Sequence, residues 1–278
     1  MSSACESCPS KSGCKSQDSC PSLEKEKRGE GNKDIKKVIG ICSGKGGVGK
    51  SFVSSMLAVA LSQKGYKVGL MDADVTGPSI PKSFGLHEML VATDENRILP
   101  AVTKGGIKAV SLNLLLDNEE APVVWRGPVI SGLVKQFWTD VDWGMLDVLL
   151  IDMPPGTGDV PLTVFQSIPV DGLVLVSTPQ DLVSMIVSKA RNMANMMNVD
   201  ILGLVENMSY IKCPHCDEKI SLFGDDEELR NAASKAGLEI MDTLPLDSAA
   251  TSLVDSGKAE DIKGISLENT ISKIEALL

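Results

Sequence analysis

A glycine-rich segment from Ser43 to Ser51 is the feature that most constrains the fold of this chain. Its letters, SGKGGVGKS, fit the pattern G-x-x-x-x-G-K-S/T, and they lie between an apolar run at 38–42 and a helical pattern that begins at Phe52. A strand-to-helix turn of this kind directs backbone N–H groups at phosphate oxygens, because glycine permits the turn and a helix N-terminus favours an anion. The segment predicts a phosphate-binding loop, and the alternative is a glycine-rich turn with no ligand.

Each residue of the loop has a part in this prediction. We expect Lys50 to reach the β- and γ-phosphates of a nucleotide and the Ser51 hydroxyl to ligate Mg²⁺. The other residues that we expect to surround the phosphates are Gly44, Lys45, Gly46, Gly47, Val48 and Gly49. Nucleotide binding with Mg²⁺ is therefore the first functional prediction.

Length and composition limit the classes of function. With 278 residues the chain can bury a substantial core, and its single series of strand and helix patterns predicts one globular domain. A net charge of −10 and an aromatic content of 4% argue against a nucleic-acid partner. No apolar stretch reaches the ~18 residues that a membrane span needs, and the N-terminus lacks the apolar core of a signal peptide. We therefore expect a cytoplasmic protein with no membrane partner.

Apolar runs alternate with helical patterns along most of the chain after residue 34. The runs that we expect to be buried strands lie at 38–42, 67–71, 147–152, 172–177 and 201–208. Helical patterns follow Phe52, span 181–197, and start again at Ser248 and Leu267. Alternation of this kind predicts an α/β fold with a doubly wound, mostly parallel sheet flanked by helices.

Acidic residues stand where two of these strands end, and doubly wound sheets bind ligands at that edge. We expect Asp152 to hold Mg²⁺ through water and Asp74 to orient or deprotonate the attacking water. Asp72 would support the metal or the loop, and either aspartate after the second strand is alternatively a helix N-cap. The loop at 154–159 contains glycines that permit rearrangement, so it is a candidate sensor of the γ-phosphate.

Seven cysteines need an explanation other than disulfides, since the cytoplasm keeps thiols reduced. A polar segment without large apolar side chains predicts a flexible tail at 1–34, before a domain at 35–278. The tail contains the pattern C-x2-C-x5-C-x5-C, which fits an iron–sulfur cluster, a zinc ion or unliganded thiols, at Cys5, Cys8, Cys14 and Cys20. Cys213 and Cys216 form a C-x-x-C, and Cys42 is expected to be a core residue.

Several further motifs occur along the chain in the order KGGVGKS, MDADVTGPS, WRGP, DMPPGTGD, ENMS and CPHC. In this order and these surroundings they resemble the Mrp/ApbC iron–sulfur carrier ATPases, over residues 36–278. That family has the deviant Walker A loop of the MinD/ParA class of P-loop NTPases, but MinD and ParA proteins lack the C-P-x-C element. The resemblance implies a homodimeric ATPase that binds a 4Fe-4S cluster and passes it to apoproteins.

The resemblance also implies roles for particular residues. Lys45 would be the lysine that reaches across the dimer to the nucleotide of the partner, and the alternative is a solvated loop lysine. Asp74 would be the catalytic residue of switch I, and Asn207, otherwise a polar strand terminus, would recognise adenine. Cys213 and Cys216 from each subunit would together hold the bridging cluster.

The N-terminal cysteines resemble those of the extended, eukaryotic-type branch of the family, whose tails carry their own cluster. Cys5, Cys8 and Cys14 match the last three positions of that pattern, and its first position lies upstream of the start of this chain. Whether Cys20 is the fourth ligand stays open, and so does the second cluster itself.

Three alternatives stand beside the carrier hypothesis. A MinD/ParA-type spatial regulator shares the nucleotide motifs, but it has no use for Cys213 and Cys216 and needs a basic surface that the acidic chain does not suggest. An electron-transfer P-loop dimer would also bridge a cluster between subunits. A zinc ion suits four thiolates from two subunits equally well by spacing. A thioredoxin-like role does not fit, because that motif belongs to a different fold.

The composition of the tail generates a first testable prediction. Deleting residues 1–34 should leave a folded dimer that still hydrolyses ATP, because the segment has almost no large apolar side chains to contribute to a core. Size-exclusion chromatography with light scattering and an ATPase assay check this. A monomeric or unfolded deletion variant would show instead that the tail supplies part of the interface or the core.

Overall fold

The computed structural model covers the 278-residue chain and describes most of its residues. These are residues 32–74, 79–94, 97–115, 127–156, 161, 168–179, 191–192, 194, 198–213, 215–216, 218–223 and 227–278. Predictions for the four tail cysteines, for the second half of the loop at 154–159 and for most of the helix at 181–197 lie outside them.

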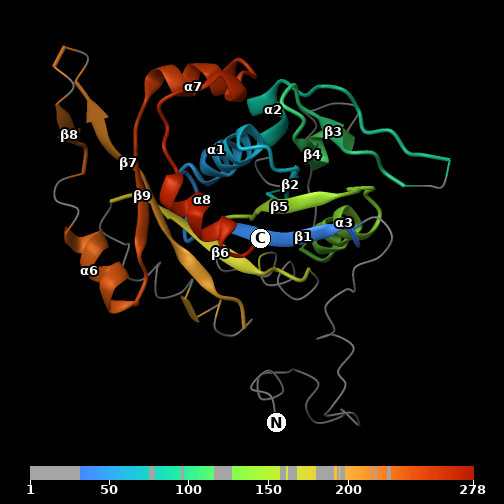
Figure 1. Ribbon diagram of the computed structural model, residues 1–278, viewed down its shortest axis with the longest axis horizontal. Coiled ribbons are helices and arrows are strands. Elements are labelled where there is room, and N and C mark those ends of the chain that lie inside the picture. Colours follow the sequence, from blue (N-terminus) through green and yellow to red (C-terminus); the bar gives the residue numbers. More distant parts are fainter. Residues whose placement is uncertain are drawn as a thin grey trace, which may run out of the picture.

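The described residues form one nine-stranded sheet (Figure 1). In chain order its strands are β1 (Ile35–Ser43), β2 (Val68–Asp72), β3 (Ala101–Val102), β4 (Lys108–Val110), β5 (Leu146–Asp152), β6 (Gly172–Ser177), β7 (Ile201–Lys212), β8 (Lys219–Ser221) and β9 (Ile240–Pro245). Their order across the sheet is β3-β4-β2-β5-β1-β6-β7-β8, and β9 also pairs with β7. Only the β3–β4 and β7–β8 pairs of this sheet are antiparallel. Strands lie on both sides of the central β1, as in a doubly wound sheet.

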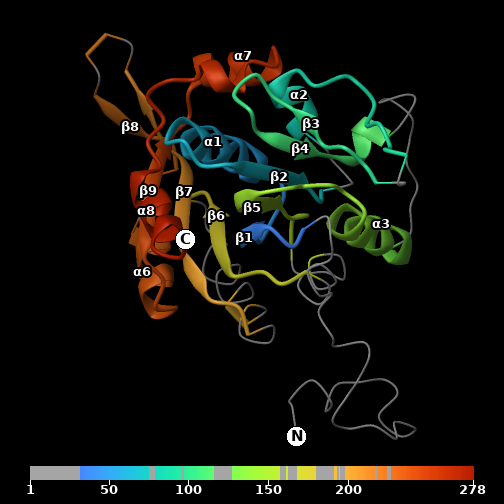
Figure 2. The same cartoon turned by 45° about the vertical axis from the view of Figure 1, so that its right-hand side comes forward.

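Helices cover both faces of this sheet (Figure 1, Figure 2). They are α1 (Lys50–Gln63), α2 (Ile80–Phe84), α3 (Gly127–Thr139), α6 (Glu227–Lys235), α7 (Ser248–Asp255) and α8 (Glu268–Glu275), with short 3₁₀ helices at Leu112–Leu115 and Ala259–Asp261. Side chains of α1, α2, α7 and α8 share one hydrophobic cluster, and side chains of α3 and α6 share another. The sheet is therefore the middle layer between two apolar cores.

Strand β5 shows why the sequence forms such a middle layer. Val148 and Leu150 pack in the cluster that contains α1, whereas Leu149 and Ile151 pack in the cluster that contains α3. Successive strand residues point to opposite faces, so a strand covered on both sides needs an unbroken apolar run. The apolar run at 148–151 meets that need.

The predicted fold class is confirmed, and each predicted strand overlaps an observed one. Sequence reasoning did not find β3, β4, β8 or β9. The first three are two or three residues long, too short to show a period, and β9 mixes buried with half-buried positions. Among the helices that the structure describes, none is long and apolar enough to cross a membrane.

Phe137 tests how far the domain depends on the core beneath α3. The side chain is fully buried in the cluster that also holds Trp138 and Leu149. Phe137→Ala should lower the free energy of unfolding by about 3–5 kcal/mol, because it removes buried apolar surface and leaves a cavity. Urea unfolding measures the loss. Met145→Ala, at a side chain that is 63% exposed, is the control, and an equal effect of the two changes would contradict this account of the core.

Candidate functional site

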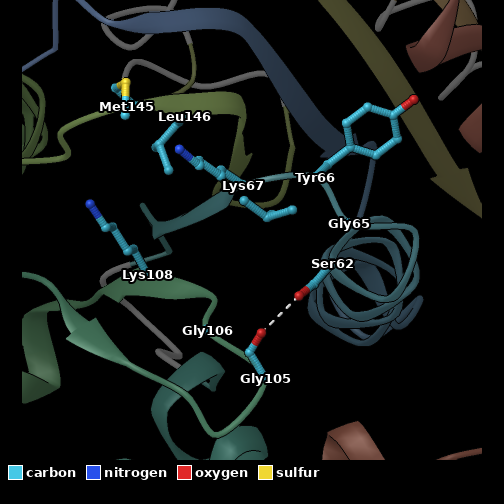
Figure 3. A pocket seen from close by; sticks show the side chains of 10 residues that line it. Ser62, Gly65, Tyr66, Lys67, Gly105, Gly106, Lys108, Met145 and Leu146 are labelled. Atoms are coloured by element: carbon cyan, nitrogen blue, oxygen red, sulfur yellow. Dashed lines mark hydrogen bonds between the residues drawn. The ribbon is translucent and has the colours of Figure 1, made fainter.

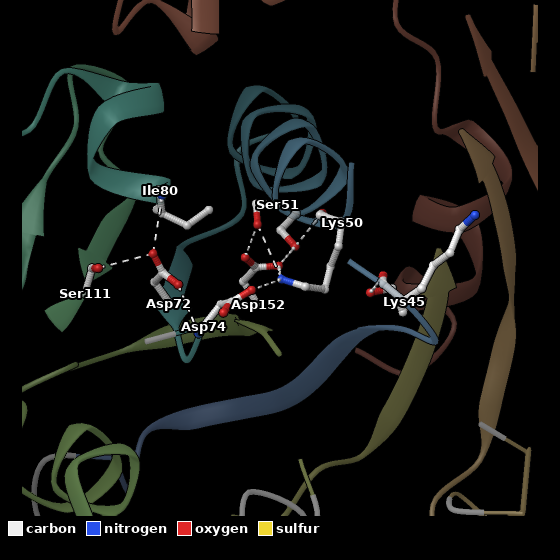
Figure 4. Close-up of polar contacts among 10 residues, drawn as sticks. Lys45, Lys50, Ser51, Asp72, Asp74, Ile80, Ser111 and Asp152 are labelled. Carbon is white, nitrogen blue, oxygen red and sulfur yellow. Dashed lines mark hydrogen bonds and ion pairs between the residues drawn. The ribbon is translucent and has the colours of Figure 1, made fainter. Parts of the chain in front are cut away.

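The phosphate-binding loop connects the centre of the sheet to a helix. β1 ends at Ser43 and α1 begins at Lys50, so the loop lies at the carboxyl edge of the central strand. β2 and β5 pair side by side and end at the same edge, with Asp72 in register with Asp152. The fold thus gathers the loop and the strand-end aspartates in one place (Figure 4).

Lys50 lies at the centre of this cluster. Its side chain is 5% exposed, and its ammonium lies 2.8 Å from Oδ1 of Asp152 and 3.5 Å from Oδ2 of Asp74 (Figure 4). A buried ammonium needs such partners, since an unpaired charge away from water is strongly disfavoured. Nucleotide phosphates carry the same negative charge, so this lysine stands where a phosphate contact can replace a carboxylate contact.

Two hydroxyl groups of α1 also contact the Asp152 carboxylate. Ser51 Oγ donates to Oδ2 at 2.5 Å, and Ser54 Oγ lies 2.7 Å from Oδ1. Hydroxyl and carboxylate oxygens are ligands that Mg²⁺ accepts, so Ser51 and Asp152 fit the ion that the sequence predicts for them. Sequence reasoning did not find Ser54, although its position one helical turn after Ser51 places it on the same face of α1.

Asp72 contacts the chain on both sides of the segment that follows β2. Its carboxylate accepts hydrogen bonds from the backbone N–H of Asp74 at 3.1 Å and of Ile80 at 3.3 Å, and from Ser111 Oγ at 3.2 Å (Figure 4). Burial, followed by the nearby Asp152 carboxylate, raises the pKa of Asp72 to about 8. These contacts link Asp72 to the segment that follows β2, and its support of the metal or of the phosphate-binding loop stays a prediction.

Asn207 contacts the phosphate-binding loop from β7. Its side chain is buried, and its amide donates to the carbonyl of Val48 at 3.0 Å. Gly49 has a φ of 80°, and a Cβ at this position would clash with the Asn207 amide nitrogen. Only glycine satisfies both the left-handed backbone and this close approach. The structure brings Asn207 to the loop, and its recognition of adenine stays a prediction.

Lys45 does not join the cluster around Lys50. It is half-buried, and Figure 4 shows its ammonium directed away from Asp152. Its carbonyl accepts a hydrogen bond from Ser43 Oγ at 3.0 Å, which links the two ends of the first loop turn. A lysine directed away from its own cluster fits the role of reaching a partner's nucleotide, which stays a prediction.

The C-x-x-C pair lies beyond the end of β7. Cys213 directly follows this strand, and β8 pairs antiparallel with it, so the pair lies in a hairpin that extends beyond the main sheet (Figure 1). Cys213 is half-buried and Cys216 is exposed. Hydrogen bonds from the backbone of His215 and Cys216 lower the pKa of the Cys213 thiol, which favours the thiolate that a metal needs. Cys42 differs, because burial raises its pKa to about 12, as a core thiol requires.

A pocket lies at the opposite edge of the sheet (Figure 3). It is bounded by the starts of β2 and β5 and by the turn before β4, and its lining includes Lys67, Lys108 and Met145. Lys108 Nζ donates to the carbonyl of Trp143 at 2.6 Å. The pocket shares no lining residue with the Lys50 cluster, so it is separate from the candidate nucleotide site.

Comparison with known families decides what kind of chain this is. The family model described as ParA, NUBPL iron-transfer P-loop NTPase, matches residues 34–276. The chain belongs to this family. The resemblance drawn from the motifs is confirmed at the level of the family, which is one of P-loop NTPases.

Individual relatives of this NUBPL-family chain agree with the assignment. An iron-sulfur cluster carrier protein of Clostridium perfringens is 47% identical over 268 residues, which cover 93% of this chain and 94% of the relative. A nucleotide-binding protein from Archaeoglobus fulgidus, solved in complex with ADP, is 43% identical with a TM-score of 0.75, over 84% of this chain and 90% of that one. The MinD cell division protein of Aquifex aeolicus is 19% identical with a TM-score of 0.58, over 87% and 96% of the two chains, which shows the fold alone.

Asp72 generates a pH-dependent prediction for this NUBPL-family NTPase. With a pKa of about 8, its carboxyl binds a proton more readily in the folded chain than in the unfolded chain, where the ordinary value is 3.8. Its contribution to stability is therefore complete below about pH 4 and is lost as the pH rises to about 8. Asp72→Asn removes that loss, so the variant should gain stability relative to the wild type between about pH 5 and about pH 8.

Urea unfolding at about pH 5 and at about pH 8, without nucleotide or metal, measures this gain in stability. Asp200→Asn is the control, because it makes the same chemical change at an exposed position. A stability difference between Asp72→Asn and the wild type that is the same at both pH values would contradict the prediction.

Proposed function

We propose that the chain is an ATP-hydrolysing carrier that assembles 4Fe-4S clusters or transfers them to apoproteins. One observation carries the proposal: β7 holds Asn207 against the phosphate-binding loop and leads directly to Cys213, with Cys216 exposed beside it. One strand therefore connects the candidate nucleotide site to the pair of thiols. The 47% identity to the iron-sulfur cluster carrier protein of C. perfringens supports the carrier half of the proposal.

In the nucleotide half of the proposal, ATP binds with its phosphates in the loop. Lys50 exchanges its contact with Asp74 for the phosphates, and the Asp74 carboxylate orients the attacking water or accepts its proton. Ser51 and Asp152 hold Mg²⁺, which when bound neutralises charge on the phosphate oxygens. Asn207 recognises adenine, and Lys45 reaches the nucleotide of a second subunit.

In the cluster half, ligand number connects the cargo to the assembly. Cys213 and Cys216 are two thiols, whereas a 4Fe-4S cluster is held by four thiolates. A second copy of the chain, related by a two-fold axis, supplies the other two, so the homodimer and the cargo site depend on each other. The extended hairpin leaves the thiols accessible to that second copy and to a recipient apoprotein.

The domain bounds, the tail site, the location and the recipients are proposed from the sequence alone. The domain at 35–278 carries ATP and the transferred cluster, and the tail at 1–34 offers a second thiolate site at Cys5, Cys8, Cys14 and Cys20. The protein works in the cytoplasm with apo iron–sulfur proteins as recipients, and its net charge of −10 supports neither a nucleic-acid nor a membrane partner.

The nucleotide site is tested by two substitutions with different expected effects. Lys50→Ala should reduce ATP hydrolysis to background, because it removes the charge that contacts the phosphates. Asp74→Ala should still bind ATP but lower the hydrolysis rate by about 100-fold or more, as expected of a group that positions water. Fluorescent-nucleotide binding, a phosphate-release assay and circular dichroism separate binding, turnover and folding. Wild-type turnover by Lys50→Ala, or loss of ATP binding by Asp74→Ala, would overturn the respective role.

The cluster site is tested by anaerobic reconstitution of the chain that lacks residues 1–34. It should take up close to four irons and four sulfides per dimer and absorb broadly near about 400 nm, because thiolates hold such clusters. Cys213→Ser or Cys216→Ser should abolish this uptake and leave ATP binding intact. Cys42→Ala is the matched control, since it removes a buried thiol that belongs to the core.

The opposite result would distinguish the alternatives. Stoichiometric zinc with no uptake of iron under reducing conditions would replace the carrier by a zinc-bridged dimer. A cluster that exchanges electrons but is never passed to an apoprotein would favour the electron-transfer dimer. Nucleotide-dependent binding to a membrane or to DNA without any metal would favour the spatial regulator.

A further inference from the structure

We propose that Ser54 is a positioning residue that holds the Asp152 carboxylate in place while nucleotide and Mg²⁺ are bound. The inference rests on the proposed function in one respect, namely that Ser51 and Asp152 serve the metal ion. It adds a residue that lies outside the phosphate-binding loop and that no motif of the sequence marks.

The geometry of α1 brings Ser54 to the carboxylate. Ser54 follows Lys50 by four residues, so both side chains lie on the face of the helix that meets the end of β5. Ser54 and Asp152 are both 0% exposed. A hydrogen bond from a hydroxyl to a carboxylate in such surroundings is short and strong, because water does not compete for either group.

The Ser54 hydroxyl has one hydrogen and two nearby acceptors. Oδ1 of Asp152 lies 2.7 Å from Oγ, and the backbone carbonyl of Lys50 lies 3.1 Å away. The carboxylate is both nearer and charged, so it takes the hydrogen. Ser54 therefore acts on Asp152 and does not merely bond back to its own helix.

Competition for the carboxylate gives this contact its importance. Within the described part of the chain, the Asp152 carboxylate forms an ion pair with Lys50 and accepts hydrogen bonds from the hydroxyls of Ser51 and Ser54. Bound phosphate would attract Lys50, and Ser51 would be a ligand of a bound metal ion. Ser54 serves neither ligand, so its hydrogen bond persists and fixes Oδ1, with Oδ2 on the side of Ser51. Replacing a residue that orients a metal-binding carboxylate typically lowers metal affinity by about 10- to 100-fold.

The chain supplies a matched control at the next residue. Ser55 is also 0% exposed on α1, and its hydroxyl has no hydrogen-bond partner among the residues that the structure describes. Ser54→Ala and Ser55→Ala remove the same atom from adjacent buried positions. Only the first removes a contact with Asp152, so the pair separates positioning from the effect of a small void.

The experiment measures metal binding directly. Mn²⁺, which accepts the same oxygen ligands as Mg²⁺, is titrated into the full chain with ADP present and followed by electron paramagnetic resonance. Ser54→Ala should weaken Mn²⁺ binding by about tenfold, and Ser55→Ala should bind Mn²⁺ as the wild type does. In ATPase assays, Ser54→Ala should need more free Mg²⁺ for half-maximal turnover and recover most of its rate at saturating Mg²⁺. The nearly isosteric Ser54→Cys, whose thiol is a weak donor, should shift both readouts in the same direction.

The outcomes separate this inference from the function on which it rests. Equal Mn²⁺ affinity in Ser54→Ala and the wild type overturns the role of Ser54, as does an equal loss in Ser54→Ala and Ser55→Ala. If Ser54→Ala fails to fold, wild-type Mn²⁺ affinity in Ser54→Cys overturns it in the same way. Failure of the wild type to bind Mn²⁺ with ADP would instead refute the metal role proposed for Ser51 and Asp152.

Discussion

A buried ammonium at the carboxyl edge of the sheet is the constraint on which the arrangement of the site depends. Lys50 is 5% exposed and lies between the carboxylates of Asp152 and Asp74, 2.8 Å from the first and 3.5 Å from the second. Such a charge is stable away from water only where opposite charges are held beside it. The strand order β2-β5-β1 meets this requirement. β5 lies between β2 and β1, so the aspartates at the ends of β5 and β2 come close to the loop that follows β1.

The same pairing connects the loop to the segment after β2. Asp72 does not contact the ammonium in Figure 4 but accepts hydrogen bonds from the backbone of Asp74 and Ile80. It thereby holds both ends of the segment that contains the candidate water-positioning residue. The ion pair from Lys50 and a hydrogen bond to Asp72 therefore both involve Asp74.

Strand β7 joins the two halves of the proposed activity. Asn207 contacts Val48 of the loop, and Cys213 begins where the strand ends. Between them Met208 has a φ of 56°, and the register between β7 and β9 shifts between Glu206 and Tyr210. A non-glycine residue with left-handed backbone is uncommon in a strand and marks local strain. The irregularity therefore lies in the part of β7 between Asn207, which contacts the phosphate-binding loop, and Cys213.

The sequence by itself determined the features that depend on neighbouring residues in the chain. The phosphate-binding loop, the apolar central strands and the C-x-x-C pair are local patterns, since glycine spacing, β-branched runs and ligand spacing act over a few residues. Only the tertiary structure decided which distant groups meet: Ser54 with Asp152, Asp72 with Ser111, and Asn207 with Val48. The short strands β3, β4 and β8 likewise exist because neighbouring strands complete their hydrogen bonds, which no pattern of two or three residues can specify.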